Sequence, residues 1–420
     1  MYKKITLAFL SFVMICAMML NLSGCDTTVQ ATNLMKDVTP NEIIPLVEDD
    51  QSIQNCATTD FAVRLFQESF EKDKNTLISP LSVLSALAMT ANGAHEETLR
   101  QMESVFGMNA KALSLYLYCY VQDLPQGEGY KLNLANSIWV NDDHHFTANQ
   151  DFLQTNADFY GADIFKAPFN DQTCREINNW INEKTDGMIE EVLDQIPDMA
   201  LMYLVNALAF DAEWEDIYDA HQVRDGVFAR EDGLKQDAEF MFSMEHSYLE
   251  DDKAIGFKKY YKNSTYAFVV MLPKEGVSVS EYVASLSGES LNAMLANPVD
   301  TMVYTSIPKF EVEYSTEMSE ILKSMGMTDA FNKDNADFEG LGTFTDGNIY
   351  LSRVLHKAYI NVGEKGTRAA AVTVIEAPEN GCYIDKMPKE VYLDRPFVYM
   401  LIDCENNIPF FIGTMMDIQG

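Results

Sequence analysis

The chain has 420 residues, of which 47% are hydrophobic, and a formal net charge of −34 at pH 7. This hydrophobic share is sufficient for a large core and excludes an acidic disordered chain. The strong negative charge argues against nucleic acid and anionic lipid headgroups as partners, and favours solubility or basic partners.

The N-terminus has the features of a secretory signal. Two lysines precede an apolar run from Ile5 to Leu20, and Leu22-Ser23-Gly24-Cys25 closes the run with small residues. The run is shorter than the ~20 residues that a membrane-spanning helix needs. The ending is similar to a bacterial lipobox, in which Cys25 would be lipidated and become the mature N-terminus. We expect residues 1–24 to be removed, leaving a secreted protein that is lipid-anchored on the extracellular face of the membrane. The alternative is an uncleaved membrane anchor.

The cysteines after Cys25 are widely scattered, at Cys56, Cys119, Cys174, Cys382 and Cys404. None belongs to a CxxC pair or to a cluster with histidine, so we expect no metal site, no cofactor and no disulfide framework. Cys382 differs from the others because its neighbours Glu379-Asn380-Gly381 look exposed; whether it has a redox role is open.

The first half of the chain favours helices. Residues 25–55 are polar and acidic and are expected to form a tether between the anchor and the folded body, which begins near Thr59. Ser79 and Pro80 suit the start of a helix that runs to Gly93. Apolar residues recur with helical spacing from Ile177 to Ile196, with a break at Thr185-Asp186-Gly187.

The second half of the chain favours strands. Leu201 to Phe210 is almost continuously apolar, which is typical of a strand buried on both faces, and Tyr266 to Leu272 is similar. Phe310, Val312 and Tyr314 alternate with charged residues, as in a half-exposed strand. A short amphipathic helix follows from Met318 to Met325, and the chain ends in a hairpin of residues 397–402 and 409–415.

Helices early and strands late, without a regular βαβ alternation, indicate an α+β fold. No internal repeat or inner linker is visible, so residues 56–420 are predicted to form one domain. The motifs GxSxG, HExxH, GxxxxGK[ST] and GxGxxG are absent, and the acidic pairs are adjacent in sequence, which suits solvated surface better than acid–base catalysis. The chain is therefore not expected to be an enzyme.

One run of small residues lies near the C-terminus: Glu364, Lys365, Gly366, Thr367, Arg368, Ala369, Ala370, Ala371, Val372 and Thr373. In an extended strand Thr367, Ala369, Ala371 and Thr373 would share one face, because side chains alternate with period two. Such a run could enter a packed sheet without steric clash. Taken alone, it is equally compatible with an alanine-rich helix.

Several segments resemble the serpins, over roughly residues 60 to 420. They are, in chain order, Asn75-Thr76-Leu77-Ile78-Ser79-Pro80-Leu81-Ser82, Leu204-Val205-Asn206-Ala207, Ile307-Pro308-Lys309-Phe310, Val354-Leu355-His356-Lys357-Ala358, Asp394-Arg395-Pro396-Phe397 and Pro409-Phe410-Phe411-Ile412-Gly413. The run at 364–373 follows His356 at the family's spacing. Each match is weak alone, but their order leaves little room for coincidence.

The resemblance implies a five-stranded main β-sheet, two smaller sheets, eight or nine helices and an exposed reactive loop over about 364–387. It implies that residues 364–373 are the hinge, which enters the main sheet first once a protease has cut the loop. The protease would then remain trapped as an acyl-enzyme. The positions matching the family's shutter and breach are Ser79, Ser82, Asn206, Trp214 and His356; none is catalytic, and each could also be an ordinary buried residue.

The scissile bond is less clear, because the stretch from Gly366 to Pro396 is longer than in common relatives. Counting from the hinge places the bond at Asn380-Gly381, whereas counting back from Pro396 places it near Asp385-Lys386. The candidates are therefore Asn380, Gly381, Cys382, Tyr383, Ile384, Asp385 and Lys386, and they suit different protease pockets. The target class, whether elastase-, chymotrypsin- or trypsin-like, stays open.

The sequence thus predicts a monomeric, membrane-tethered inhibitor of serine proteases that acts as a suicide substrate. A non-inhibitory serpin acting as a binding or adhesion protein is the alternative. A charged residue or proline at Thr367 or Ala369 would favour that alternative, and neither position has one. A solute-binding lipoprotein would share the lipobox but leaves the hinge unexplained.

Overall fold

The computed structural model describes residues 31–44, 51–125, 127, 129–142, 145–197, 200–345, 347–367 and 387–419. The predicted signal segment, Cys25, the hinge from Arg368 to Thr373 and every scissile-bond candidate lie outside the described residues. Within them, no helix is both long enough and apolar enough to cross a membrane.

The first sheet has the strand order β1-β5-β3-β6-β15-β14-β12. Its strands are β1 (Thr32–Asn33), β3 (Tyr130–Asn141), β5 (Asp163–Ala167), β6 (Met202–Glu213), β12 (Phe310–Glu317), β14 (Arg353–Gly363) and β15 (Gly366–Thr367). The strands β1 and β15 have two residues each. The five longer strands make the predicted main sheet, to which β1 adds an edge and β15 adds a short insertion between β6 and β14.

The second sheet follows the path β16-β11-β8-β9-β10-β17-β18-β2, and β7 pairs with β8 beside this path. Its strands are β2 (Thr76–Ile78), β7 (Val223–Ala229), β8 (Lys235–Glu250), β9 (Ala254–Tyr260), β10 (Tyr266–Pro273), β11 (Val299–Pro308), β16 (Lys389–Tyr392), β17 (Phe397–Asp403) and β18 (Pro409–Met415). The two smaller sheets that we expected are joined here, because the 16-residue strand β8 pairs with β7 and β11 and also with β9 at its end. A separate small sheet pairs β4 (Thr147–Ala148) with β13 (Gly342–Thr343).

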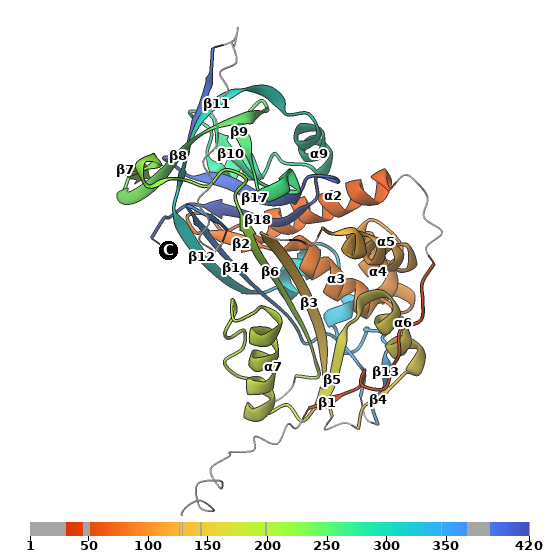
Figure 1. Ribbon diagram of the computed structural model, residues 1–420. Helices are drawn as coiled ribbons and strands as arrows, with labels where there is room; N and C mark the ends of the chain where they lie inside the picture. The colour runs from red at the N-terminus through yellow and green to blue at the C-terminus, as the bar shows by residue number, and fades with distance from the viewer. Residues whose placement is uncertain are drawn as a thin grey trace, which may run out of the picture. The chain divides into compact units, whose positions relative to one another are not determined.

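The α-helices of the described residues are α2 (Ser52–Ser69), α3 (Pro80–Ala91), α4 (Glu96–Phe106), α5 (Ala110–Asp123), α6 (Gln150–Tyr160), α7 (Asp171–Lys184), α8 (Val279–Val283), α9 (Gly288–Ala296) and α10 (Ser319–Ser324). Figure 1 shows α3 to α6 on one side of the main sheet and α7 on the other. Helix α3 begins at Pro80, which has no N–H to leave unpaired at a helix start, and all of its residues are buried.

Strand β6 is the centre of the fold because both of its faces are buried. Leu204 and Leu208 point into the main core, which packs against α2 to α6. Tyr203, Val205 and Ala207 point to the other face, into a second cluster with Ile177, Trp180 and Ile181 of α7. The period-two alternation of a strand divides an almost continuous apolar run between two cores, as the sequence predicted.

Residues 31–44 and the start of α2 differ from the expected tether. Thr32 and Asn33 pair with β5, and the Leu34 N–H donates to the Ile164 carbonyl over 2.8 Å. Leu34, Met35 and Val38 pack against the main core. Helix α2 also begins at Ser52, before the predicted onset of order near Thr59. The described part of 25–55 therefore belongs to the folded body.

Candidate functional site

The strands β6 and β14 pair at one end and separate at the other. Their parallel register runs from Arg353 opposite Tyr203 to Ala358 opposite Leu208. Beyond this point β15 lies between them, with Thr367 opposite Val362 of β14 and opposite Ala212 of β6. Strand β15 is antiparallel to both neighbours. The main sheet is thus already open at this end and holds the first residues of the predicted hinge.

Gly366 fits this opening because it has no side chain. Its φ is +153°, and a Cβ built on it would come within 1.9 Å of the Ala212 carbonyl oxygen. Any other residue would collide with the backbone of β6. The preceding glycine, Gly363, has open space where a Cβ would lie. Close approach of two backbones, and not a loose turn, therefore explains the glycine at position 366 of the predicted hinge.

Thr367 is buried, with 1% of its surface exposed. Its hydroxyl shares a hydrogen bond with the Tyr261 hydroxyl, which is also fully buried. Burial raises the pKa of Tyr261 well above its ordinary value, so this phenol stays neutral. The Tyr261 ring stacks on Trp214 with 4.4 Å between ring centroids. Aromatic rings thus surround Thr367, the last described residue of the predicted hinge.

Trp214 and Tyr218 bind the chain that leads into β15. The Trp214 indole N–H donates to the Gly363 carbonyl over 2.9 Å. The backbone N–H of Trp214 donates to the Lys365 carbonyl, and that of Tyr218 donates to the Glu364 carbonyl, each over 2.9 Å. Trp214 therefore lies directly beside the turn of residues 364–365.

Charged side chains flank the same turn. Glu364 forms an ion pair with Lys309, whose Nζ also lies 3.1 Å from Glu239. Burial raises the pKa of Glu364, but its hydrogen bonds and the nearby charges of Lys309 and Lys365 together outweigh burial, so the pKa is lowered. Deeper inside, Lys259 Nζ lies 2.9 Å from Glu245 and 4.5 Å from the Tyr218 ring centroid.

A second polar cluster lies where β6 and β14 are still paired. The His356 Nε2 accepts from the Ser79 N–H over 3.1 Å, so its proton is on Nδ1, which donates to Asn206 Oδ1 over 2.8 Å. The Ser82 hydroxyl donates to the same oxygen over 2.9 Å, and the Asn206 amide donates to the Leu355 carbonyl over 3.1 Å. Burial lowers the pKa of His356 from 6.5 to about 3, so the imidazole is neutral.

Of the five predicted shutter and breach residues, Asn206 lies on β6 and His356 on β14. The other three, Ser79, Ser82 and Trp214, each form a hydrogen bond with one of these two strands. The Ser79 hydroxyl has no hydrogen-bond partner among the described residues. Of the hinge, residues 364–367 are described. Sequence reasoning missed Tyr261, Tyr218, Lys259 and the pairing role of Lys309. Of these, Lys309 alone lies in a segment that carried the resemblance.

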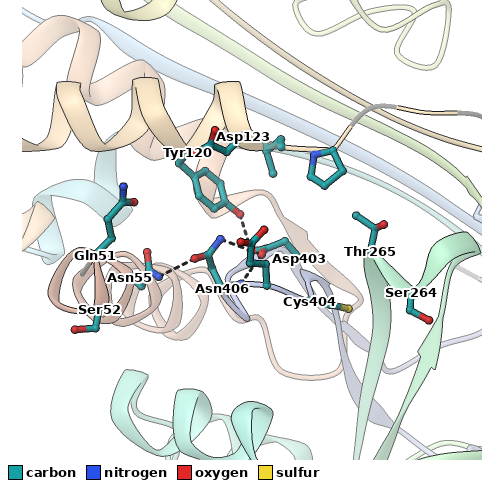
Figure 2. Close-up of a pocket in the computed structure, with 13 residues that line it drawn as sticks. Gln51, Ser52, Asn55, Tyr120, Asp123, Ser264, Thr265, Asp403, Cys404 and Asn406 are labelled. Atoms are coloured by element: carbon teal, nitrogen blue, oxygen red, sulfur yellow. Dashed lines mark hydrogen bonds between the residues drawn. The ribbon is translucent and has the colours of Figure 1, made fainter. Parts of the chain in front are cut away.

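A polar cavity of about 890 Å³ lies elsewhere, between the start of α2, the end of α5 and the turn from β17 to β18. Figure 2 shows the Tyr120 hydroxyl donating to Asp403, 2.8 Å away, and Asn55 bonded to Asn406. Asp403 also accepts from the backbone of Asn406 and Ile408. These bonds hold the turn against two helices, and none of the predicted site residues lines the cavity. In the described part of the chain, no group of three His, Cys, Asp or Glu side chains could hold a metal ion.

Comparison with known proteins agrees with this geometry. The sequence profile of the family described as Serpin (serine protease inhibitor) matches residues 56–418. The leukocyte elastase inhibitor of Homo sapiens is 28% identical over 376 residues, covering 85% of this chain and 97% of that protein. The crystal structure of tengpin, a thermophilic serpin, in its native state has a TM-score of 0.88 and 46% identity, and covers 93% of this chain and 100% of tengpin. The crystal structure of tengpin in its latent state has a TM-score of 0.77 and 42% identity, and the match covers 90% of this chain and 100% of tengpin.

Proposed function

Because the chain belongs to the serpin family, a family of protease inhibitors, we propose that it inhibits serine proteases as a suicide substrate. The observation that carries the proposal is the position of β15. Gly366 and Thr367 lie between β6 and β14, antiparallel to both, at the end where these strands separate. A cut on the C-terminal side of the hinge would free it to continue as a full strand in the same gap.

The chemistry comes from the protease. Its serine would attack the carbonyl carbon of the scissile bond in the segment 380–386, release the new amino terminus, and leave an ester between the enzyme and the hinge side of the chain. Insertion would then carry the esterified end along the sheet. At ~3.3 Å per residue, a strand of about fifteen residues moves its end by about 50 Å. The distorted protease would no longer hydrolyse the ester.

Insertion requires the paired part of β6 and β14 to open. The His356–Asn206 contact lies in this part, because these two residues are opposite each other in register. Since each polar atom of a buried cluster is costly to leave unpaired, the cluster would favour the closed or the fully inserted sheet over partly opened states. The cluster would therefore keep the native sheet closed until the loop is cut.

The test is a mixture of the protein with elastase-, chymotrypsin-, trypsin- and subtilisin-like enzymes, followed by boiling in detergent. A complex that survives boiling is expected with at least one enzyme, and sequencing of the released C-terminal peptide would identify the scissile bond. If every enzyme cuts the segment and departs free, the protein is not an inhibitor of these proteases.

The sequence at Cys25 supports a secreted protein tethered to the extracellular face of the membrane by a lipid. Expression in a bacterium should place the wild-type chain in the membrane fraction, and Cys25→Ser should move it to the soluble fraction. Equal partitioning of the two chains would contradict the anchor without affecting the inhibitory mechanism.

A further inference from the structure

Exposed hydrophobic side chains are concentrated on one part of the second sheet. In the described residues, the large ones on or beside β7, β8, β11 and β16 are Val227, Leu234, Met244, Val299, Tyr304, Met387 and Tyr392. Those elsewhere are Ile44, Ile53 and Ile217. Single exposed apolar residues need no explanation, but a concentration on neighbouring strands does.

Four side chains form a continuous surface across β8, β11 and β16, which we name the outer patch: Phe242, Met244, Tyr304 and Tyr392. Met244 lies directly opposite Tyr304, and Phe242 and Tyr392 both lie opposite Ser306 of the strand between them. The period of two places all four on the same face. The rings of Phe242 and Tyr392 are 6.5 Å apart. Met244 is 47%, Tyr304 42% and Tyr392 36% exposed.

The opposite face of the same strands is held in place by a partly buried network of hydrogen bonds. Ser243 and Thr305 share a hydrogen bond of 2.9 Å, and Ser243 donates to Glu245 over 2.6 Å. Glu245 in turn pairs with the buried Lys259. Because these contacts fix the orientation of the strands, the side chains of the outer patch stay on the exposed face of the sheet.

The composition of the outer patch suits a protein interface. Tyr, Phe, Met and Arg are enriched at interface centres. The Arg224 guanidinium lies 5.3 Å from the Phe242 ring centroid and adds a cation beside the apolar surface. A small molecule would need a concave pocket, and these residues line neither the polar cavity beside Asp403 nor the smaller cavity beside Tyr160 and Trp180.

The position of β16 in the chain indicates which partner would bind the outer patch. This strand begins at Lys389, directly after the proposed reactive loop, and it carries Tyr392. Tyr392 is six positions after Lys386, at most about 20 Å of extended chain, and twelve positions after Asn380, at most about 40 Å. A protease domain of roughly 200 residues has a radius of about 20 Å. A protease engaged at either candidate bond thus has the outer patch within its reach.

We propose that the outer patch is a second contact surface for the target protease, used when the protease first docks on the reactive loop. This inference rests on the proposed inhibitory function. Apolar burial at the patch would stabilise the encounter complex before acylation, and would favour proteases that present an apolar surface beside their active-site cleft. The patch lies outside the moving strands, so it would affect association and not the later insertion.

The test uses the double variant Met244→Ser/Tyr304→Ser of the full chain, with Ile53→Ser on α2 as the matched exposed control. With a protease that forms the detergent-stable complex, the association rate constant of the double variant should fall about tenfold, since each tenfold corresponds to 1.4 kcal/mol of lost contact. The moles of inhibitor consumed per mole of protease should stay unchanged. The same protease with its nucleophilic serine replaced by alanine should bind the double variant with a Kd about tenfold weaker, and Ile53→Ser should match wild type.

The outcomes separate the two proposals. If the wild type forms no detergent-stable complex, the proposed inhibitory function is wrong. The Kd values measured with the serine-to-alanine protease still test whether the outer patch is a docking surface. If the complex forms but the double variant keeps the wild-type rate and Kd, the outer patch is not a docking surface. If sedimentation shows a wild-type dimer that the double variant loses, the occupant is a second copy of this chain and the inference is wrong.

Discussion

His356 and Asn206 lie opposite each other in the parallel pairing of β14 with β6, and the imidazole Nδ1 is 2.8 Å from the Asn206 Oδ1. The contact lies in the part of the sheet that is still closed, whereas β15 already occupies the open end. The two strands that would have to part for the proposed insertion are therefore linked through buried side chains as well as through their backbones.

The neutral His356 predicts a pH dependence of stability. Burial lowers its pKa from 6.5 to about 3 in the folded protein, so between these values the unfolded chain binds the proton and the folded protein does not. The neutral His356 therefore contributes its full share to the free energy of unfolding above pH 6.5. As the pH falls from 6.5 towards 3, this share is lost by up to about 1.4 kcal/mol per pH unit.

Urea unfolding of the wild type and of His356→Gln at several pH values checks this. Other titrating groups are common to both proteins, so the difference between them isolates His356. The wild type should lose stability more steeply below pH 6.5 than the variant. Parallel pH profiles would contradict a buried neutral imidazole.

Gly366→Ala should prevent β15 from entering the gap. The new Cβ would lie 1.9 Å from the Ala212 carbonyl oxygen. We expect native stability to fall by more than about 2 kcal/mol, and more inhibitor to be consumed per protease. Gly363→Ala is the matched control, because its Cβ would meet no atom within 4 Å. Similar behaviour of the two variants would show that close packing at Gly366 is unimportant.

Thr367→Arg should convert the proposed inhibitor into a substrate. Thr367 is 1% exposed and bonded to Tyr261, so arginine would put an unpaired charge into the sheet at a cost of several kcal/mol. Insertion would become slow relative to ester hydrolysis. Gels should show cleaved chain in place of the detergent-stable complex, whereas Thr367→Ser should keep the complex. Undiminished complex formation by the arginine variant would be incompatible with insertion beginning at Thr367.

Asn178→Ala tests the segment that covers the outer face of the main sheet. The Asn178 Oδ1 accepts from Val192 N–H over 3.0 Å and from Leu193 N–H over 3.1 Å, and its amide donates to the Leu193 carbonyl over 2.8 Å. Losing these bonds leaves backbone groups unpaired, and stability should fall by about 1–3 kcal/mol. The exposed Arg175→Ala on the same helix should change stability by less than about 0.5 kcal/mol. Equal midpoints of thermal unfolding for both variants would refute this role.

Strands with strong periodicity were predictable from the sequence. The apolar run at 201–210 became β6, and the alternation at Phe310 and Val312 became the half-exposed β12. Residues 31–44 were not recognised, because a two-residue pairing with β5, a few apolar contacts and the bonds of Asn41 to Asp158 hold them without a regular apolar periodicity. The partnership of Tyr261 with Thr367 could not be predicted either, since it joins positions 106 residues apart through a single hydroxyl pair.

The most direct test of loop insertion is the thermal unfolding midpoint before and after a single cut in residues 374–386. A metalloprotease is the right reagent, because it uses water as the nucleophile and forms no acyl-enzyme. A new central strand would gain backbone hydrogen bonds on both sides, so the midpoint should rise by at least about 10 °C. A cut chain, verified by mass, that melts at the same temperature as the intact protein or below it would contradict insertion between β6 and β14.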